Sequence, residues 1–126
     1  TGSDGVIMGG SGGHNDAAAG AKLTIVVANL TRGRLPIIVD KVLTATTPGE
    51  TIDVLVTERG IAVNPRRQDL KEKLAAAGLA VTDIAQLKAI AEKMAGVPKT
   101  ITTGKRIVAL VEYRDGTVID IVKQVE

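Results

Sequence analysis

Cysteine, phenylalanine and tryptophan are absent from the 126-residue chain, and Tyr113 is its only aromatic residue. The lack of cysteine excludes disulfides, thiol nucleophiles and thiolate metal sites. Without other aromatic rings, the core has to be built from Val, Ile, Leu and Ala, which bury less area per side chain. His14 is the only histidine, so a histidine-rich metal site is excluded as well. We therefore expect no metal site.

Strong charge of one sign and long apolar runs are missing too. The formal net charge is only +2, and no basic stripe with interleaved aromatic residues is present, so nucleic acid is not an expected partner. No apolar run approaches the roughly 18 residues that a membrane span needs, and residues 1–20 lack the apolar segment of a signal peptide. We expect a cytoplasmic protein without membrane contact. Because the first residue is Thr1 rather than Met, we also expect a processed product or an excised fragment.

Glycine, by contrast, is concentrated at the start, where the first thirteen residues hold six of the 14 glycines. The order of residues predicts a short strand at 6–8, a glycine loop at 9–13 and an Ala-rich helix beginning within 14–22. Such an arrangement aims backbone N–H groups and a helix N-terminus at one point, which suits a phosphate, a carboxylate or a developing oxyanion. The spacing matches neither the dinucleotide fingerprint nor the P-loop. A tight turn without any ligand explains the same residues equally well.

The sequence His14-Asn15-Asp16 follows this loop directly. A Ser11–His14–Asp16 triad is not expected, because residues so close in sequence do not reach the required geometry unless the chain folds back. We expect Asn15 or Asp16 to cap the Ala-rich helix instead.

The rest of the chain has the pattern of an α/β domain with a mainly parallel sheet and flanking helices. Residues 23–28 and 52–56 are apolar on both faces, as strands buried in parallel sheets are. Asn64-Pro65 predicts the start of a helix that ends at Gly78. A second helix is predicted from Thr82 or Asp83 to Gly96, with Ile84, Leu87, Ala91 and Met94 as its apolar stripe. Further strands are expected at 37–39, 42–46 and 61–63, and Asp115-Gly116 predicts a hairpin of strands 106–113 and 117–125.

Two arginines follow the first long strand, in Thr31-Arg32-Gly33-Arg34. Open α/β sheets bind ligands at the carboxyl ends of their strands, and Arg forms paired hydrogen bonds with phosphate. Arg32 and Arg34 are therefore candidate anion-binding residues, although exposed charges on a solvated loop would look the same.

Charged residues also mark the end of the second long strand and the start of the next helix. Glu58 is compatible with a buried acid, a partner for Arg or an exposed turn residue. Arg66-Arg67 opposes the preference of a helix N-terminus for negative charge, which indicates either an anionic partner or simple solvent exposure.

Motifs along the whole chain resemble one family. They are GSDGVI at 2–7, GGSGGHND at 9–16, PG at 48–49 followed by IDVLVT at 52–57, GIAVNPRR at 60–67 and YRDGTVID at 113–120. Together these motifs resemble the C-terminal portion of the citrate lyase alpha subunit. More distantly, Gly-Gly-x-x-Asp and Val-Thr-Glu-x-Gly-Ile-Ala are similar to motifs of the class I coenzyme A transferases.

The resemblance implies a coenzyme A transferase-like fold, with residues 1–97 in its α/β part and residues 98–126 as a C-terminal hairpin packed on the same domain. It also implies an oligomeric enzyme that exchanges acetyl for citryl on an acyl carrier, releasing acetate. The expected partners are citrate, acetate, the rest of the alpha subunit, the beta subunit and the acyl carrier (gamma) subunit. No cofactor is expected to be tightly bound. The substrate is a thioester of coenzyme A or of the carrier's dephospho-coenzyme A-derived group.

The same resemblance implies roles for individual residues. Gly12 and Gly13 match glycines that face the acyl group, and Gly10 and Arg32 are the expected contacts to coenzyme A or the carrier. The family's nucleophilic glutamate lies upstream of the glycine loop, where this chain has no Glu, so no catalytic nucleophile is expected here and the chain alone should be inactive. Asp16 and Glu58 match recurrent positions, and we expect structural roles for both.

Two other functions fit the same residues. The chain is also compatible with a non-catalytic module that binds a thioester carrier or partner subunits through its hairpin and apolar helices. A Rossmann-type nucleotide-binding domain is the weakest alternative, because only Asp40 could serve as its ribose-binding acid.

Overall fold

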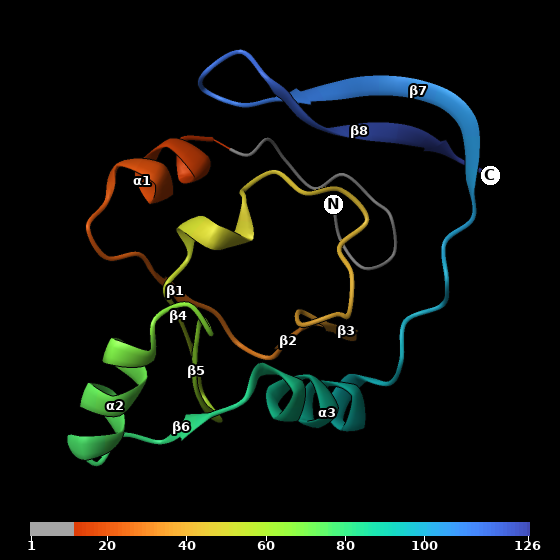
Figure 1. Ribbon diagram of the computed structural model, residues 1–126. Helices are drawn as coiled ribbons and strands as arrows, with labels where there is room; N and C mark the ends of the chain where they lie inside the picture. The colour runs from red at the N-terminus through yellow and green to blue at the C-terminus, as the bar shows by residue number, and fades with distance from the viewer. Residues whose placement is uncertain (1–11) are drawn as a thin grey trace.

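The computed structural model describes residues 12–126 and joins strands from well-separated parts of the chain (Figure 1). The strand predicted at 6–8 and most of the glycine loop lie outside the described residues. Within them, the helices are α1 (His14–Gly20), α2 (Gln68–Ala76) and α3 (Ile84–Ala95), with a 3-10 turn at Gly49–Thr51. The strands are β1 (Ile25–Val27), β2 (Thr31–Arg32), β3 (Leu35–Pro36), β4 (Val54–Thr57), β5 (Gly60–Val63), β6 (Val81–Thr82), β7 (Thr103–Glu112) and β8 (Val118–Val125).

A four-stranded sheet in the order β1-β4-β5-β6 forms the centre of the fold. β1 pairs with β4 in parallel, with Ile25 opposite Val54, and β5 pairs with β6 in parallel, with Ile61 opposite Val81. β4 and β5 form an antiparallel hairpin between these two pairs. Two of the three pairings are therefore parallel, and the predicted α/β class with a parallel-containing sheet is confirmed.

The first strand is less buried than the sequence predicts. Ile25 is 52% exposed and Val27 is 77% exposed, so burial of β1 on both faces is wrong for this chain. The physical reason is the position of β1 at the edge of the sheet, with β4 as its paired neighbour among residues 12–126.

The core lies where α3 packs against β5 and the β2–β3 hairpin. Leu87 and Ala91 are fully buried, and they cluster with Leu30, Ile38 and Ala62. Residues four apart lie on the same face of a helix, which is why these two enter the core together. Ile84 and Met94, at the ends of the predicted stripe, are about half exposed instead. The helix ends at Gly96, whose φ of +84° favours glycine, as predicted.

The other long helix starts later than predicted. α2 begins at Gln68, with Arg67 in the cap position, so the predicted cap at Asn64 is wrong. The Asn64 amide nitrogen donates to the carbonyl oxygens of Gly49 and Ile52, and its side-chain oxygen accepts the Arg66 N–H. Asn64 thus fixes a turn before the helix rather than the helix itself.

The cap expected for the Ala-rich helix is also wrong. Gly13 occupies the N-cap position of α1 without a side-chain hydrogen bond. The Asn15 side-chain oxygen accepts the adjacent Asp16 N–H, and Asn15 is largely buried. Asp16 lies in the first turn, where its negative charge suits the helix dipole.

No strand forms within residues 37–46, contrary to prediction. Instead β2 and β3 form a tight hairpin just before this segment, turning at Gly33 with φ of +61°. Side chains rather than a strand ladder hold the segment in place. The Lys88 ammonium pairs with Asp40, and the Asp120 carboxylate accepts the Ala45 N–H at 2.6 Å. Residues 37–46 therefore run as an irregular connection.

The C-terminal hairpin of β7 and β8 is confirmed, with Gly116 at φ +84° in its turn. It forms a two-stranded sheet separate from the four-stranded one (Figure 1). Asp120 ties it to Ala45. The division of the chain at residue 97 into two parts stays a prediction.

Candidate functional site

A large open cavity surrounds Arg32, and we call it the Arg32 cleft. Its volume is about 930 Å³. Residues of the 32–43 segment form one wall, Lys88 and Glu92 of α3 form another, and residues 97–101 close the third side. Two parts of the chain that are distant in sequence, residues 32–43 and residues 88–101, therefore meet at this site.

The position of Arg32 follows from the residue two places before it. Leu30 is fully buried in the core. Its carbonyl oxygen accepts the Ile37 N–H at 2.8 Å, which closes the base of the β2–β3 hairpin. Arg32 and Leu35 are opposite each other in that hairpin, with the Gly33 turn between them. The short hairpin thus presents an exposed Arg32 side chain at the mouth of the cleft.

The charges along the Arg32 cleft have an excess of positive sign. Its lining holds four cationic and two acidic side chains, Arg32, Lys41, Lys88, Lys99, Asp40 and Glu92. The Lys88 ammonium lies 3.0 Å from both Asp40 and Glu92, and the hydrogen bond to Asp40, followed by the one to Glu92, raises the pKa of Lys88. Lys88 thus stays charged but neutralised, which leaves Arg32, Lys41 and Lys99 without an ion-pair partner among those lining residues.

The remaining lining is mostly apolar, and includes Leu35, Ile37, Val42, Val97 and Ile101. An apolar surface with excess cations at its border suits a ligand that has both a long apolar arm and an anionic end. Sequence reasoning identified Arg32 but missed Lys88, Lys99 and the apolar wall. The spacing of Lys88 and Glu92, four residues apart on a helix, was the one available signal for the ion pair.

The glycines expected to face the acyl group lie elsewhere. Gly12 has φ of +57°, and Gly13 caps α1. Neither lines the Arg32 cleft, so among the described residues the structure does not bring them and Arg32 into one cavity. A Cβ atom at Gly13 would meet nothing within 4 Å, which leaves open space in front of it. Gly10 lies outside the described residues.

Residues near that helix make only local contacts. The His14 Nδ1 atom lies 2.9 Å from the Thr47 hydroxyl, and Asp16 lies 3.8 Å from the Arg114 guanidinium. These contacts join α1 to the 3-10 turn region and to the C-terminal hairpin. They are compatible with the structural role expected of Asp16.

The Arg67 side chain has its anionic partners within the chain. It lies 2.6 Å from Asp53 and 3.1 Å from Asp69. The Thr24 N–H donates to the other Asp53 oxygen at 2.8 Å. That hydrogen bond, and then Arg67, lower the pKa of Asp53. Arg67 thus has intrachain ion pairs, which join α2 to the β1–β4 pair, and an anionic ligand at Arg66-Arg67 stays a prediction.

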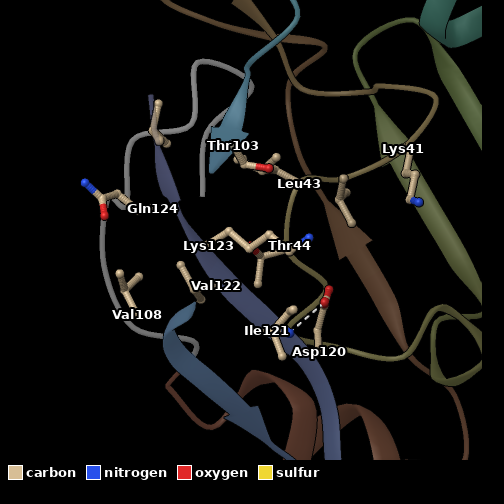
Figure 2. Close-up of a pocket in the computed structure, with 12 residues that line it drawn as sticks. Lys41, Leu43, Thr44, Thr103, Val108, Asp120, Ile121, Val122, Lys123 and Gln124 are labelled. Atoms are coloured by element: carbon tan, nitrogen blue, oxygen red, sulfur yellow. Dashed lines mark hydrogen bonds between the residues drawn. The ribbon is translucent and has the colours of Figure 1, made fainter. Parts of the chain in front are cut away.

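A second, smaller cavity of about 500 Å³ lies between the 41–44 segment and the hairpin (Figure 2). Figure 2 shows Thr44, Ile121 and Val122 beside it. Asp120 borders this cavity, but its carboxylate is occupied by the N–H groups of Ala45 and Ile121, which lower its pKa. This cavity offers fewer unpaired charges than the Arg32 cleft.

Neither a metal centre nor a membrane helix emerges from residues 12–126. No group of three or more His, Asp or Glu side chains there is placed to hold a metal ion. None of the helices in that range is both long and apolar enough to cross a bilayer.

Comparison with known proteins gives one consistent result. The sequence model of the family "citrate lyase, alpha subunit (CitF)" matches residues 1–125. The chain is 56% identical to the citrate lyase alpha chain of Klebsiella pneumoniae and 53% identical to that of Escherichia coli, in each case over all 126 residues and 25% of the relative. A crystal structure from Streptococcus mutans, described as an alpha subunit of citrate lyase in complex with citrate, has a TM-score of 0.94 at 52% identity. It too is covered over 25% of its length by the whole of this chain. The chain therefore spans about a quarter of these relatives.

Proposed function

The chain belongs to the citrate lyase alpha subunit family, and we propose that it supplies part of the site that moves a thioester carrier from acetate to citrate. In this reaction acetyl carrier and citrate give citryl carrier and acetate. The working enzyme would include the rest of the alpha subunit, a beta subunit and an acyl carrier subunit, as a cytoplasmic oligomer.

One observation carries the proposal. The similarity extends over every residue of the chain at 52–56% identity, and the backbone agrees at a TM-score of 0.94 with a structure that contains citrate. A similarity of this extent supports a shared role in the reaction more strongly than any single motif does.

The Arg32 cleft suits the carrier. The proposed ligand, a group derived from dephospho-coenzyme A, has a phosphate-containing end and a long arm. We place the phosphates near Arg32, Lys41 and Lys99 and the arm along the apolar wall. Gly12 and Gly13 would lie at the acyl end of the same ligand, so they need not share a cavity with Arg32.

The chemistry proposed for the acyl end needs hydrogen-bond donors rather than a nucleophile from this chain. A glutamate from outside residues 1–126 would attack the thioester carbonyl and displace the carrier thiolate, giving a mixed anhydride. Negative charge develops on the carbonyl oxygen during the attack, and backbone N–H groups around Gly12 and Gly13 would stabilise it.

Arg32 offers the direct test of carrier binding. The protein to use is a chimera in which these 126 residues replace the matching quarter of the Klebsiella pneumoniae alpha chain. Calorimetry should detect binding of dephospho-coenzyme A to the chimera. Arg32→Ala should weaken this binding about 10-fold or more, because a charged hydrogen bond is lost. Arg34→Ala is the matched control, since Arg34 is exposed on the same turn but does not line the cleft. Equal effects of both substitutions would count against the assignment.

Gly13→Val tests the acyl end in the same chimera. Gly13 has φ of −85° and open space around its Cβ position, so valine should leave the fold intact by circular dichroism. We expect loss of binding of an acetyl thioester of dephospho-coenzyme A, because the branched side chain would fill the space proposed for the acyl group. Unchanged affinity would indicate that the loop is only a turn.

A non-catalytic assembly module is the second candidate, and exposed apolar residues on the hairpin favour it. Ile107, Val108, Leu110 and Val118 are each at least 51% exposed. Such surfaces often mark contacts with another chain or domain. A chimera that assembles with its partner subunits but binds no dephospho-coenzyme A would support this candidate over the first.

A further inference from the structure

The side chain of Glu58 reaches from the β4–β5 turn to the backbone of Leu30. The Leu30 N–H lies 3.1 Å from one Glu58 carboxylate oxygen and 3.0 Å from the other. We propose that Glu58 is a positioning residue, which holds the β2–β3 hairpin so that Arg32 faces the anionic end of the carrier. This inference rests on the proposed function of the Arg32 cleft and adds a residue to it.

The backbone N–H of Leu30 needs this acceptor. After β1, the Ala28 N–H donates to the Val56 carbonyl oxygen at 3.0 Å, and the chain then leaves the sheet. Leu30 is fully buried two residues later. A buried N–H without an acceptor is strongly unfavourable, and here the Glu58 carboxylate is the acceptor.

Fixing the backbone of Leu30 also fixes that of Arg32. The carbonyl oxygen of Leu30 accepts the Ile37 N–H, so both backbone polar groups of Leu30 are hydrogen-bonded. They frame a hairpin in which Arg32 is paired with Leu35. With the hairpin base held at Leu30, the direction of Arg32 depends on the Glu58 contact.

Glu58 itself projects from a turn that is held by hydrogen bonds. The Thr57 hydroxyl donates to the Gly60 carbonyl oxygen at 2.8 Å and accepts the Arg59 N–H at 3.2 Å. β4 and β5 pair up to Thr57 and Gly60, directly beside this turn. Both carboxylate oxygens of Glu58 already face Leu30, and their negative charge would repel an anionic ligand. Glu58 is therefore suited to act through Arg32 rather than on the ligand.

Kinetics of the chimera test the inference, with an acetyl thioester of dephospho-coenzyme A as the varied substrate. Glu58→Ala should raise KM about 10-fold, similar to Arg32→Ala, with a smaller effect on kcat. Glu58→Gln should stay close to the parent, because its amide oxygen still accepts the Leu30 N–H. In the Arg32→Ala background, Glu58→Ala should raise KM no further, since the two substitutions disrupt one interaction.

Asn64→Ala is the control for a purely structural loss. It removes hydrogen bonds to the Gly49 and Ile52 carbonyl oxygens, and Asn64 does not line the cleft. We expect it to lower the melting temperature without changing KM. If Glu58→Ala does not fold, Glu58→Asp replaces it, because the shorter side chain withdraws the carboxylate and should also raise KM.

The outcomes separate the two claims. If Arg32→Ala raises KM while the folded Glu58 variant does not, or if the two effects simply add, the positioning role is overturned and the carrier site stands. If Arg32→Ala leaves KM unchanged, the carrier assignment fails and the role of Glu58 fails with it.

Discussion

At the scale of single residues, the contact of Asp53 with Thr24 and Arg67 links β4 to the chain before β1 and to the start of α2. The Thr24 N–H and Arg67 lower the pKa of Asp53, so the folded state binds a proton less readily than the unfolded chain does. A lowered carboxyl pKa contributes stability above the unfolded value of about 3.9, and this stability is lost as the pH falls.

We therefore expect Asp53→Asn to make stability less dependent on acid pH. Urea unfolding of the parent should show a loss of stability between about pH 5 and pH 2 that is smaller in Asp53→Asn. At pH 7 the substitution should destabilise by about 1 to 2 kcal/mol. Asp69→Asn is the control and should change the pH dependence less: Arg67 lowers the pKa of Asp69 as well, but the Asp69 side chain is 55% exposed and solvent screens the pair. The same pH dependence in the parent and Asp53→Asn would refute this explanation.

Gly60 is required because β5 and the chain at β6 approach each other closely there. Its φ is +149°, and a Cβ atom there would lie 2.9 Å from Thr82 Cγ2 and 3.3 Å from the Ala80 carbonyl oxygen. Gly60→Ala should destabilise by about 2 to 4 kcal/mol, from backbone strain and overpacking together.

Gly78→Ala separates these two causes. Gly78 has φ of +76° but nothing within 4 Å of the Cβ position, so its loss should be only about 1 kcal/mol. Chemical denaturation of both variants gives the comparison. Equal losses would mean that packing against Thr82 has no effect.

The sequence indicates at this scale that Arg67 needs either an anionic partner or solvent. It cannot name Asp53, because that contact depends on β4 passing the start of α2. The same applies to Glu58, whose acceptor role appears only when Leu30 is placed beside the β4–β5 turn.

At the scale of elements, α3 supplies the helical residues of the core, where it packs against β5 and the β2–β3 hairpin. Leu87 is fully buried on it, whereas Met94 is 50% exposed on the same helix. Leu87→Ala should destabilise by about 2 to 5 kcal/mol, because it leaves a cavity among Leu30, Ile38 and Ala62. Met94→Ala should change stability by less than about 0.5 kcal/mol. Denaturant unfolding in which both substitutions cost the same would contradict this view of the core.

Turns and the C-terminal ends of helices are the elements that the sequence predicts best. Gly78, Gly96 and Asp115-Gly116 act locally, through backbone conformations that favour these residues, and the structure has turns or helix ends there. The predicted strands within 37–46 are wrong because apolar residues alone do not provide a neighbour to pair with. The cap at Asn64 is wrong because distant carbonyl oxygens compete for its side chain.

At the scale of the whole molecule, the candidate site is made by two parts of the chain, residues 32–43 and residues 88–101, that only the fold brings together. The sequence predicts Arg32 from its place after a strand, but the opposite wall, with Lys88 and residues 97–101, depends on where α3 packs. The exposed apolar residues of β1 have a related origin, because an edge strand is buried only when further structure covers it. The chain spans about a quarter of its relatives, so the proposed activity belongs to a larger assembly.

Acyl exchange by the chimera with the Klebsiella pneumoniae alpha chain tests the central claim most directly. The measurement is citrate-dependent release of acetate from an acetyl thioester of dephospho-coenzyme A. We predict that the chimera retains exchange, that Arg32→Ala raises its KM, and that the 126-residue chain alone shows no turnover. A folded, assembled chimera without exchange, or robust turnover by the isolated chain, would contradict the proposal that this chain supplies one part of a shared transferase site.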